Sequence, residues 1–356
     1  MEQPHHRLLA VVRELVGDRL PADRADALLA RIDEHEAAIR DTWLLGGVNP
    51  SRPDADPSWD LARAQAYAPT ERVGAVHLEL GTFTSFPPSK VDEMVRGDGL
   101  AEFLRLDFDR AYAPDLVADV TALPLREASV DRVASNSLFE HVSHPHRIIR
   151  ESFRVLRPGG VMVVVMPFVI HRHGYPHDYV RLTPQFFERA CREAGFADVI
   201  VDDDASSGLF NVLHNSSKMA AADDALPEAE AVRAVHEAVV GLLGALLPLD
   251  RLLRDQSRTW FHSVRVLAVK PGTYEPSRRP RGAGPLVPRI ADLLADPETK
   301  APVVWDGRRL VCDFTGRWFP VEGDMAVMTE PRALESPPVP LRERARAAAR
   351  KRVKGA

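Results

Sequence analysis

Short apolar runs alternate with helix-like patterns along the chain after the Pro- and Asp-containing stretch at residues 50–57. This alternation is typical of a parallel sheet whose two faces are covered by helices. The apolar runs predict strands at residues 75–80, 103–106, 116–118, 130–134, 161–166, 197–202 and 263–269. We therefore expect an α/β fold.

Two helices are predicted between these strands. The second begins at Thr183, whose side chain can cap the first turn, and ends at Gly195. The first is expected to end at the Pro-Gly-Gly turn of residues 158–160. A longer helical insertion at residues 216–258 separates the last two strands, and we expect it over the carboxyl end of the sheet. The apolar face of the first helix consists of Ile148, Ile149, Phe153 and Leu156.

The ends of the chain differ in pattern from this central part. Residues 1–70 carry two helical stripes without a strand signal, so they form a separate N-terminal helical segment. A main domain at residues 71–271 is followed by a Pro-, Gly- and Arg-rich linker at residues 272–288. Residues 289–330 predict a small β-rich module, and residues 331–356 a basic tail. The aromatic core expected for the module is Trp305, Phe314, Trp318 and Phe319.

Composition excludes several classes of protein. A net charge of -5 and a pI near 6.2 argue against a surface built to hold nucleic acid. Two cysteines are too few for a disulfide framework, and the first residues lack a secretory pattern. The longest apolar run, at residues 238–249, is shorter than the roughly 20 residues of a membrane-spanning helix. We expect a cytoplasmic protein with no membrane span.

Residues 106–167 combine acids with short apolar runs, one helix and a Pro-Gly-Gly turn, which is the layout of a nucleotide-type binding site. From residue 76 to residue 196 the sequence resembles class I S-adenosylmethionine-dependent methyltransferases. The resemblance rests on an acid, a Leu-Pro-aliphatic turn, Glu-His-Val and Arg-Val-Leu-Arg-Pro-Gly-Gly, in that order. It implies a methyltransferase with a seven-stranded Rossmann-like sheet, helices on both faces, and S-adenosylmethionine as cofactor.

The resemblance also implies which residues bind the cofactor. Glu79 and Gly81 match the first loop, which holds the methionine end. Asp107 matches the acid that accepts both ribose hydroxyls, and a carboxylate suits a vicinal diol because each oxygen can take one proton. Asp119 matches the acid that binds the adenine amino group. The remaining cofactor positions are Thr82, Phe108, Val120, Ser135 and Asn136.

The glycine loop departs from the family pattern. Two further glycines are expected after Gly81, but residues 82–88 read Thr-Phe-Thr-Ser-Phe-Pro-Pro. Bulky residues restrict the positive backbone angles that glycine permits. Two interpretations follow: the loop takes another course and still holds the cofactor, or the domain has become a scaffold.

The stretch at residues 167–184 looks like the His-x-x-Pro-x-Asp-Tyr-x-Arg-x-Thr segment of small-molecule and sugar methyltransferases. It follows a strand, so it should border the acceptor pocket. Histidine can take a hydroxyl proton near neutral pH, and the candidate bases are His141, His173 and His177. The candidate substrate-binding residues are Asp178, Tyr179 and Arg181; Asp178 could also orient a base, or it could serve with His177 only to fix the loop.

The C-terminal module resembles the zinc-ribbon-like activator proteins of some methyltransferases. Three of the four cysteine positions of that pattern are occupied by Asp296, Thr299 and Thr315, and Cys312 is the fourth. A structural zinc site needs four strong ligands, so we expect no metal in the module and none in the chain.

These observations favour transfer of a methyl group to oxygen, or as second choice nitrogen, of a small-molecule acceptor such as a sugar or specialised metabolite. The activator-like module and basic tail leave an RNA or protein methyltransferase as an alternative, and the altered glycine loop leaves a catalytically silent scaffold. The sequence does not fix the oligomeric state.

Overall fold

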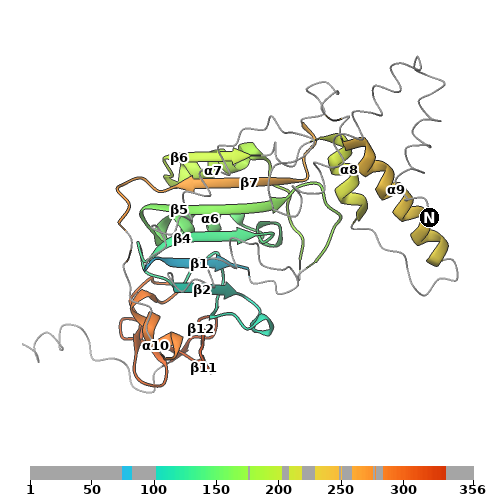
Figure 1. Ribbon diagram of the computed structural model, residues 1–356. Coiled ribbons are helices and arrows are strands. Elements are labelled where there is room, and N and C mark those ends of the chain that lie inside the picture. Colours follow the sequence, from blue (N-terminus) through green and yellow to red (C-terminus); the bar gives the residue numbers. More distant parts are fainter. Residues whose placement is uncertain are drawn as a thin grey trace, which may run out of the picture.

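Figure 1 shows the computed structural model of the chain, which describes residues 74–81, 102–174, 177–202, 208–218, 229–247, 259–275 and 284–333, with residues 250 and 277. Thr82, the predicted N-terminal helices of residues 1–70 and the predicted tail beyond residue 333 lie outside the described residues.

A nine-stranded sheet forms the centre of the described structure (Figure 1). The strand order is β11-β12-β3-β2-β1-β4-β5-β7-β6. Strands β12, β3, β2, β1, β4 and β5 pair in parallel, whereas β7 is antiparallel to β5 and β6. The bounds are β1 Val76–Leu80, β2 Glu102–Asp107, β3 Leu116–Val117, β4 Val130–Asn136, β5 Leu156–Pro167, β6 Asp198–Asp202, β7 Ser263–Val269, β11 Val321–Glu322 and β12 Met325–Val327. The predicted α/β class is confirmed.

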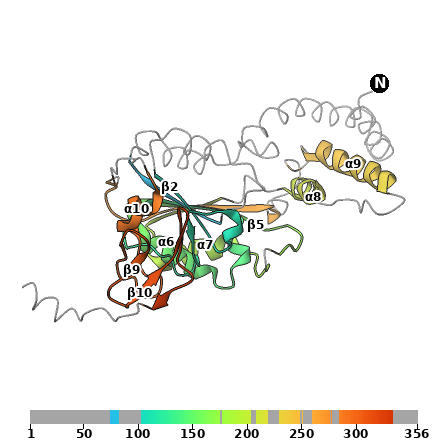
Figure 2. The same cartoon turned by 90° about the horizontal axis from the view of Figure 1, so that it is seen from below.

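Two described helices, α6 (Pro145–Val155) and α7 (Pro184–Ala194), cover one face of the sheet (Figure 2). The predicted ends of α7 are confirmed. Thr183 Oγ1 accepts a hydrogen bond from the Phe186 amide at 3.3 Å, and Gly195 closes the helix at φ 110°. A Cβ on Gly195 would lie 2.8 Å from the Phe153 ring, so both backbone angle and packing require glycine there.

The prediction that Pro-Gly-Gly ends the first helix was wrong. Helix α6 ends at Val155, and Leu156 already pairs with Val130 as the first residue of β5. The ammonium of Lys270 donates to the Phe153 and Leu156 carbonyls, both at 2.7 Å, and thereby satisfies groups that a continuing helix would have used. The Pro-Gly-Gly residues lie within β5, where the pairing with β4 shifts register.

The predicted C-terminal module contributes two strands to the main sheet. In the parallel pairing of β12 with β3, Ala326 lies opposite Leu116 and Val327 opposite Val117. The Met328 amide donates to the Val117 carbonyl at 2.8 Å. The main sheet therefore extends beyond the seven strands expected of the central domain.

The rest of the module forms a four-stranded sheet of order β13-β10-β9-β8, with bounds β8 Val304–Trp305, β9 Leu310–Cys312, β10 Arg317–Phe319 and β13 Arg332–Ala333. Phe319 is fully buried, but Phe314 is 68% exposed, so its predicted place in the core was wrong. Phe314 lies in the turn between β9 and β10 and points outward. Two short helices, α10 Leu286–Ile290 and η6 Ala291–Leu293, precede the module's strands.

The helical insertion begins earlier than predicted, with α8 at Leu209–Lys218 and α9 at Ala229–Leu246. The carboxylate of Asp250 accepts the Phe210 and Asn211 amides, each at 2.9 Å, and so caps α8. Both helices lie beyond the carboxyl ends of the parallel strands (Figures 1 and 2), as expected. In the described part of the chain, no helix has the length and apolar character needed to cross a membrane.

Candidate active site

The candidate site lies at one edge of the sheet. Strands β1, β2, β3 and β4 run in parallel, so their carboxyl ends meet at the same edge. Gly81, Asp107, Asp119 and Asn136 lie at or just after those four ends. The predicted cofactor residues are therefore brought to one side of the sheet.

Gly81 directly follows β1 and has a positive φ of 79°. Its amide donates to the Leu106 carbonyl at 2.9 Å, which ties the start of the loop to β2. A Cβ on Gly81 would lie 3.2 Å from Leu138 Cδ1, tighter than most side chains tolerate. Both features require glycine at position 81. Glu79, two residues earlier within β1, is half-buried.

Asp107 is the last residue of β2, and its Oδ1 accepts the Asp109 amide at 2.8 Å. This bond orients the carboxylate. The Phe108 side chain is 70% exposed beside it, which is unusual for a large apolar group. An oriented acid and an exposed ring side by side suit a ribose and its attached base.

Asp119 follows β3, and its Oδ1 accepts the Thr121 amide and hydroxyl at 2.7 and 2.8 Å. The side chain of Val120 is buried, so any contact from this residue to a ligand comes from its backbone. On β4, Ser135 is buried, and its hydroxyl has no hydrogen-bond partner within the described residues. Asn136 next to it is exposed at the end of the strand.

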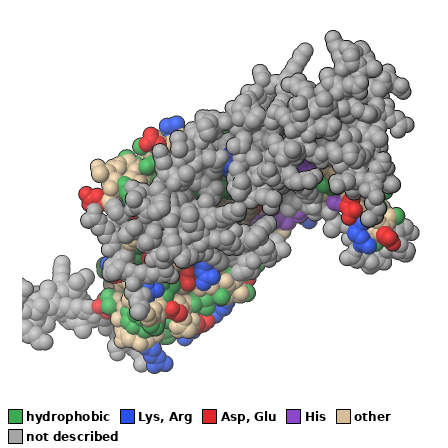
Figure 3. Space-filling view, in the orientation of Figure 1, with side chains coloured by type: hydrophobic (Ala, Val, Ile, Leu, Met, Phe, Trp, Pro, Cys, Tyr) green, Lys and Arg blue, Asp and Glu red, His purple; other side chains and the backbone are tan. Residues whose placement is uncertain are grey.

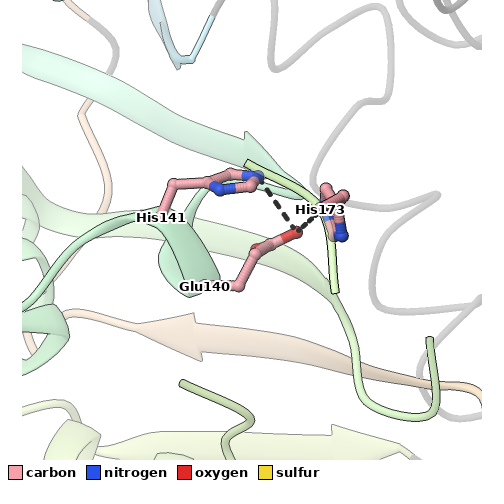
Figure 4. A group of neighbouring side chains, drawn as sticks. All are labelled: Glu140, His141 and His173. Atoms are coloured by element: carbon pink, nitrogen blue, oxygen red, sulfur yellow. Dashed lines mark ion pairs between the residues drawn. The ribbon is translucent and has the colours of Figure 1, made fainter. Parts of the chain in front are cut away.

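A second group of side chains gathers around Glu140 (Figure 4). Its Oε1 lies 3.8 Å from Nε2 of His141 and 3.9 Å from Nε2 of His173. Glu140 and His141 belong to η2 (Phe139–His141), which follows β4, whereas His173 comes from the stretch after β5. The two imidazole rings meet edge to face, 4.9 Å apart. The structure thus brings together two of the three histidines that the sequence singles out.

Hydrogen bonds from the stretch after β5 hold this group in place. The Tyr179 amide donates to the Glu140 carbonyl at 2.8 Å, and Nδ1 of His141 lies 2.6 Å from the His177 carbonyl. The ring of His177 is exposed and lies tilted against the Tyr179 ring, with 5.4 Å between their centroids, so His177 joins the group through its backbone carbonyl. Histidine side chains are visible on the surface toward the end that carries α9 (Figure 3).

Asp178 and Arg181 form an ion pair next to His173. Nη1 and Nη2 of Arg181 both donate to the Asp178 carboxylate, Nη2 at 2.8 Å. This hydrogen-bonded partner lowers the pKa of Asp178 well below its usual range. The Asp178 carboxylate also accepts the His173 amide at 3.0 Å. Asp178 therefore fixes the stretch that carries His173.

Glu140 was missed as a site residue in the sequence analysis, although it belongs to the Glu-His-Val motif. Its side chain is fully buried, and neither carboxyl oxygen has a hydrogen-bond partner within the described residues. Burial raises the pKa of Glu140, and its own backbone amide and the nearby His141, His173 and Arg181 only partly oppose that shift. A buried carboxyl without a hydrogen bond is costly and is typical of a functional position.

Comparison with known proteins identifies one segment of the chain. Residues 79–164 match the family model described as a methyltransferase domain. Residues 79–164 of the chain therefore contain a methyltransferase domain. The oriented carboxylate of Asp107 and the hydroxyl of Ser135, which has no hydrogen-bond partner within the described residues, can form hydrogen bonds with S-adenosylmethionine, so the described residues fit this cofactor.

Individual relatives match over short stretches. The chain is 36% identical over 88 residues to the malonyl-[acyl-carrier protein] O-methyltransferase of Methylococcus capsulatus, covering 24% of this chain and 32% of that protein. It is 42% identical over 65 residues to an uncharacterized methyltransferase of Mycolicibacterium gilvum, covering 17% and 26%. The chain thus spans about a third or less of these relatives. A solved S-adenosylmethionine-dependent methyltransferase from Archaeoglobus fulgidus has a TM-score of 0.37 at 15% identity, over 60% of this chain and 95% of the other.

Proposed function

We propose that the protein transfers a methyl group from S-adenosylmethionine to an oxygen atom of a small-molecule acceptor, with nitrogen as the second choice. The observation that carries this proposal is the Glu140–His141–His173 group at the edge where the cofactor residues also lie. The O-methyltransferase among the relatives is consistent with an oxygen acceptor. The proposed location of the protein is the cytoplasm.

In this proposal, different residues bind different parts of S-adenosylmethionine. Asp107 would accept the ribose hydroxyls, with Phe108 against the base, and Asp119 would accept the adenine amino group. Gly81 leaves room for the methionine end, near the hydroxyl of Ser135 and the side chain of Asn136. When bound, S-adenosylmethionine supplies an electrophilic methyl carbon, and the electron pair of the broken carbon–sulfur bond stays on sulfur.

The protein's contribution to such a transfer is to hold the acceptor oxygen in line with the methyl carbon and to remove its proton. His141 from η2 and His173 from the stretch after β5 both direct Nε2 toward Glu140. We place the acceptor hydroxyl at this group, where it loses its proton. Tyr179, which is 51% exposed, is positioned to contact the rest of the acceptor.

The C-terminal module acts, in this proposal, as a built-in support of the methyltransferase domain. Pairing of β12 with β3 covers the outer edge of β3, and Asp119 follows β3 by two residues. Lys300 of the module also donates to Glu151 of α6 at 2.8 Å. Support of this kind would take the place of a separate activator protein.

The test is incubation of the purified chain with methyl-labelled S-adenosylmethionine and a fractionated cell extract. Label is expected in the small-molecule fraction, and mass spectrometry identifies the acceptor. His141→Ala and His173→Ala should each lower turnover at least tenfold with little change in cofactor affinity, whereas His146→Gln, an exposed histidine of α6, should not. Label in RNA or protein alone would overturn the small-molecule acceptor, and no cofactor binding would support a scaffold.

A further inference from the structure

The group around Glu140 contains three hydrogen-bond acceptors that face one another. Nδ1 of His141 lies against the His177 carbonyl at 2.6 Å, and a carbonyl can only accept, so Nδ1 carries the proton. The lone pair of His141 is therefore on Nε2, the atom directed at the Glu140 carboxyl.

The same reasoning applies to His173. Its Nδ1 lies 3.1 Å from the His171 carbonyl and 3.7 Å from Oδ2 of Asp178, both of which are acceptors. The proton is again on Nδ1, and the Nε2 lone pair again points at Oε1 of Glu140, 3.9 Å away. Two ring nitrogens and a carboxyl oxygen thus converge on one point.

The spacing of these atoms suits a shared cation better than a hydrogen bond. Distances of 3.8 and 3.9 Å are too long for hydrogen bonds, and the three ligand atoms all lie within 4.8 Å of one another. Two ligands held at about 2.1 Å by one tetrahedral ion lie roughly 3.4 Å apart. A closure of about half an ångström would bring Oε1 of Glu140 to this spacing from Nε2 of each histidine.

The surroundings are those of a metal site as well. Histidine ligands of metals usually donate their other ring nitrogen to a carbonyl or carboxylate, which fixes the tautomer, and both rings here do so. The nearby positive charge of Arg181 is paired with Asp178. Glu140 is buried, whereas His141 and His173 are only partly so, and a ligand can therefore approach from the histidine side.

We infer that Glu140, His141 and His173 bind a divalent first-row transition metal ion such as Zn²⁺. Two histidines and one carboxylate leave coordination positions open for an exogenous ligand. For the proposed function, that ligand is an oxygen-rich acceptor: the ion binds the acceptor hydroxyl and lowers its pKa, the proton leaves to solvent, and the oxygen keeps the electron pair that attacks the methyl carbon. The histidines then act as ligands in place of accepting the proton themselves.

Metal binding is tested without any methyl transfer. The full chain is dialysed against a chelator, and Zn²⁺ is titrated by calorimetry at pH 7.5, with Co²⁺ absorption as a spectroscopic readout of histidine and carboxylate ligation. One ion per chain is expected. Glu140→Gln and His173→Gln should each weaken Zn²⁺ binding at least tenfold, and the control His146→Gln should leave it unchanged. Glu140→Gln keeps the shape of the buried side chain, and its thermal unfolding shows whether the variant is folded.

Two outcomes overturn the inference: Zn²⁺ binding that is equal in the wild type and in Glu140→Gln, or binding that is lost with His146→Gln. Failure of the proposed function is seen separately, because a chain that binds one ion at this group but methylates nothing keeps the metal site and loses the activity. Turnover that is unchanged after chelator treatment would show that methyl transfer needs no metal ion, and His141 and His173 would then be the bases that accept the proton.

Discussion

The hydroxyl of Thr315 lies 3.2 Å from Oδ2 of Asp296 and donates to it, joining two positions at which the activator pattern has cysteines. Oδ1 of the same carboxylate accepts the Glu298 and Thr299 amides at 3.0 and 2.9 Å, and Asp296 is fully buried. A hydrogen-bonded carboxylate thus links the two loops at which the sequence resemblance would place metal ligands.

We expect Asp296→Ala to lower the free energy of unfolding by about 2–4 kcal/mol, because three donors in a buried site lose their acceptor. Denaturant unfolding followed by circular dichroism measures the loss. Glu298→Ala removes an exposed ion pair with Arg317 from the same turn and should cost less than about 1 kcal/mol. Equal effects of the two substitutions would show that the Asp296 bonds do not hold the module.

The pairing of β12 with β3 leads to a second prediction. The Ala326 amide donates to the Asp115 carbonyl at 2.9 Å, and proline at this position has no amide proton to donate. Ala326→Pro should increase hydrogen exchange at residues 115–120 at least tenfold. Arg332→Pro, placed in the outer strand of the four-stranded sheet, is the control and should leave residues 115–120 protected. Unchanged protection in Ala326→Pro would mean that β3 is stable without β12.

The sequence predicts the central sheet well because each strand is a local apolar run, and all seven predicted strands are present. The β12–β3 pairing could not be predicted in the same way. Ala326 and Leu116 are more than 200 positions apart, and Met325–Val327 is only a short strand whose partner depends on tertiary packing. The end of α6 was misplaced for a related reason, since a distant lysine, Lys270, bonds its last carbonyls.

The site was partly predictable. Residues at the ends of parallel strands share an edge, and the resemblance to class I methyltransferases singled out Asp107, His141 and His173 near those ends. Glu140 could not be selected in this way, because an acid beside a polar histidine is expected to face solvent. Only the three-dimensional structure shows that Glu140 is buried and that its carboxyl oxygens have no hydrogen-bond partner within the described residues.

Cofactor affinity should depend on Asp107. Asp107→Ala removes a charged acceptor of the ribose hydroxyls, and calorimetric binding of S-adenosylmethionine should weaken by more than a factor of ten. Asp109→Ala is the matched control: it also removes an acid from this loop, where its Oδ1 accepts the Ala111 amide. If both variants weaken binding equally, Asp107 acts through loop shape and does not bind the ribose.

The last prediction concerns Glu151 of α6, which joins the methyltransferase domain to the C-terminal module. Burial alone would raise the pKa of Glu151, but hydrogen bonds from Arg154 and Lys300 outweigh it and lower the pKa below the usual 4.5. A carboxyl whose pKa is depressed by folding stabilises the folded state above its unfolded pKa, and this contribution is lost as the pH falls through the folded pKa.

Glu151→Gln should therefore lower the free energy of unfolding by about 1–3 kcal/mol at pH 7, and the difference from wild type should shrink as the pH falls below 4.5. Urea unfolding at a series of pH values measures it. Glu193→Gln is the control, because its pair with Arg189 is exposed and screened by solvent, so the substitution should leave the free energy of unfolding nearly unchanged at every pH. A difference that stays constant from pH 7 to pH 3 would show that Glu151 acts through packing. A difference that comes from the ion pairs must disappear once the wild-type carboxyl is protonated, because the wild type then lacks them too.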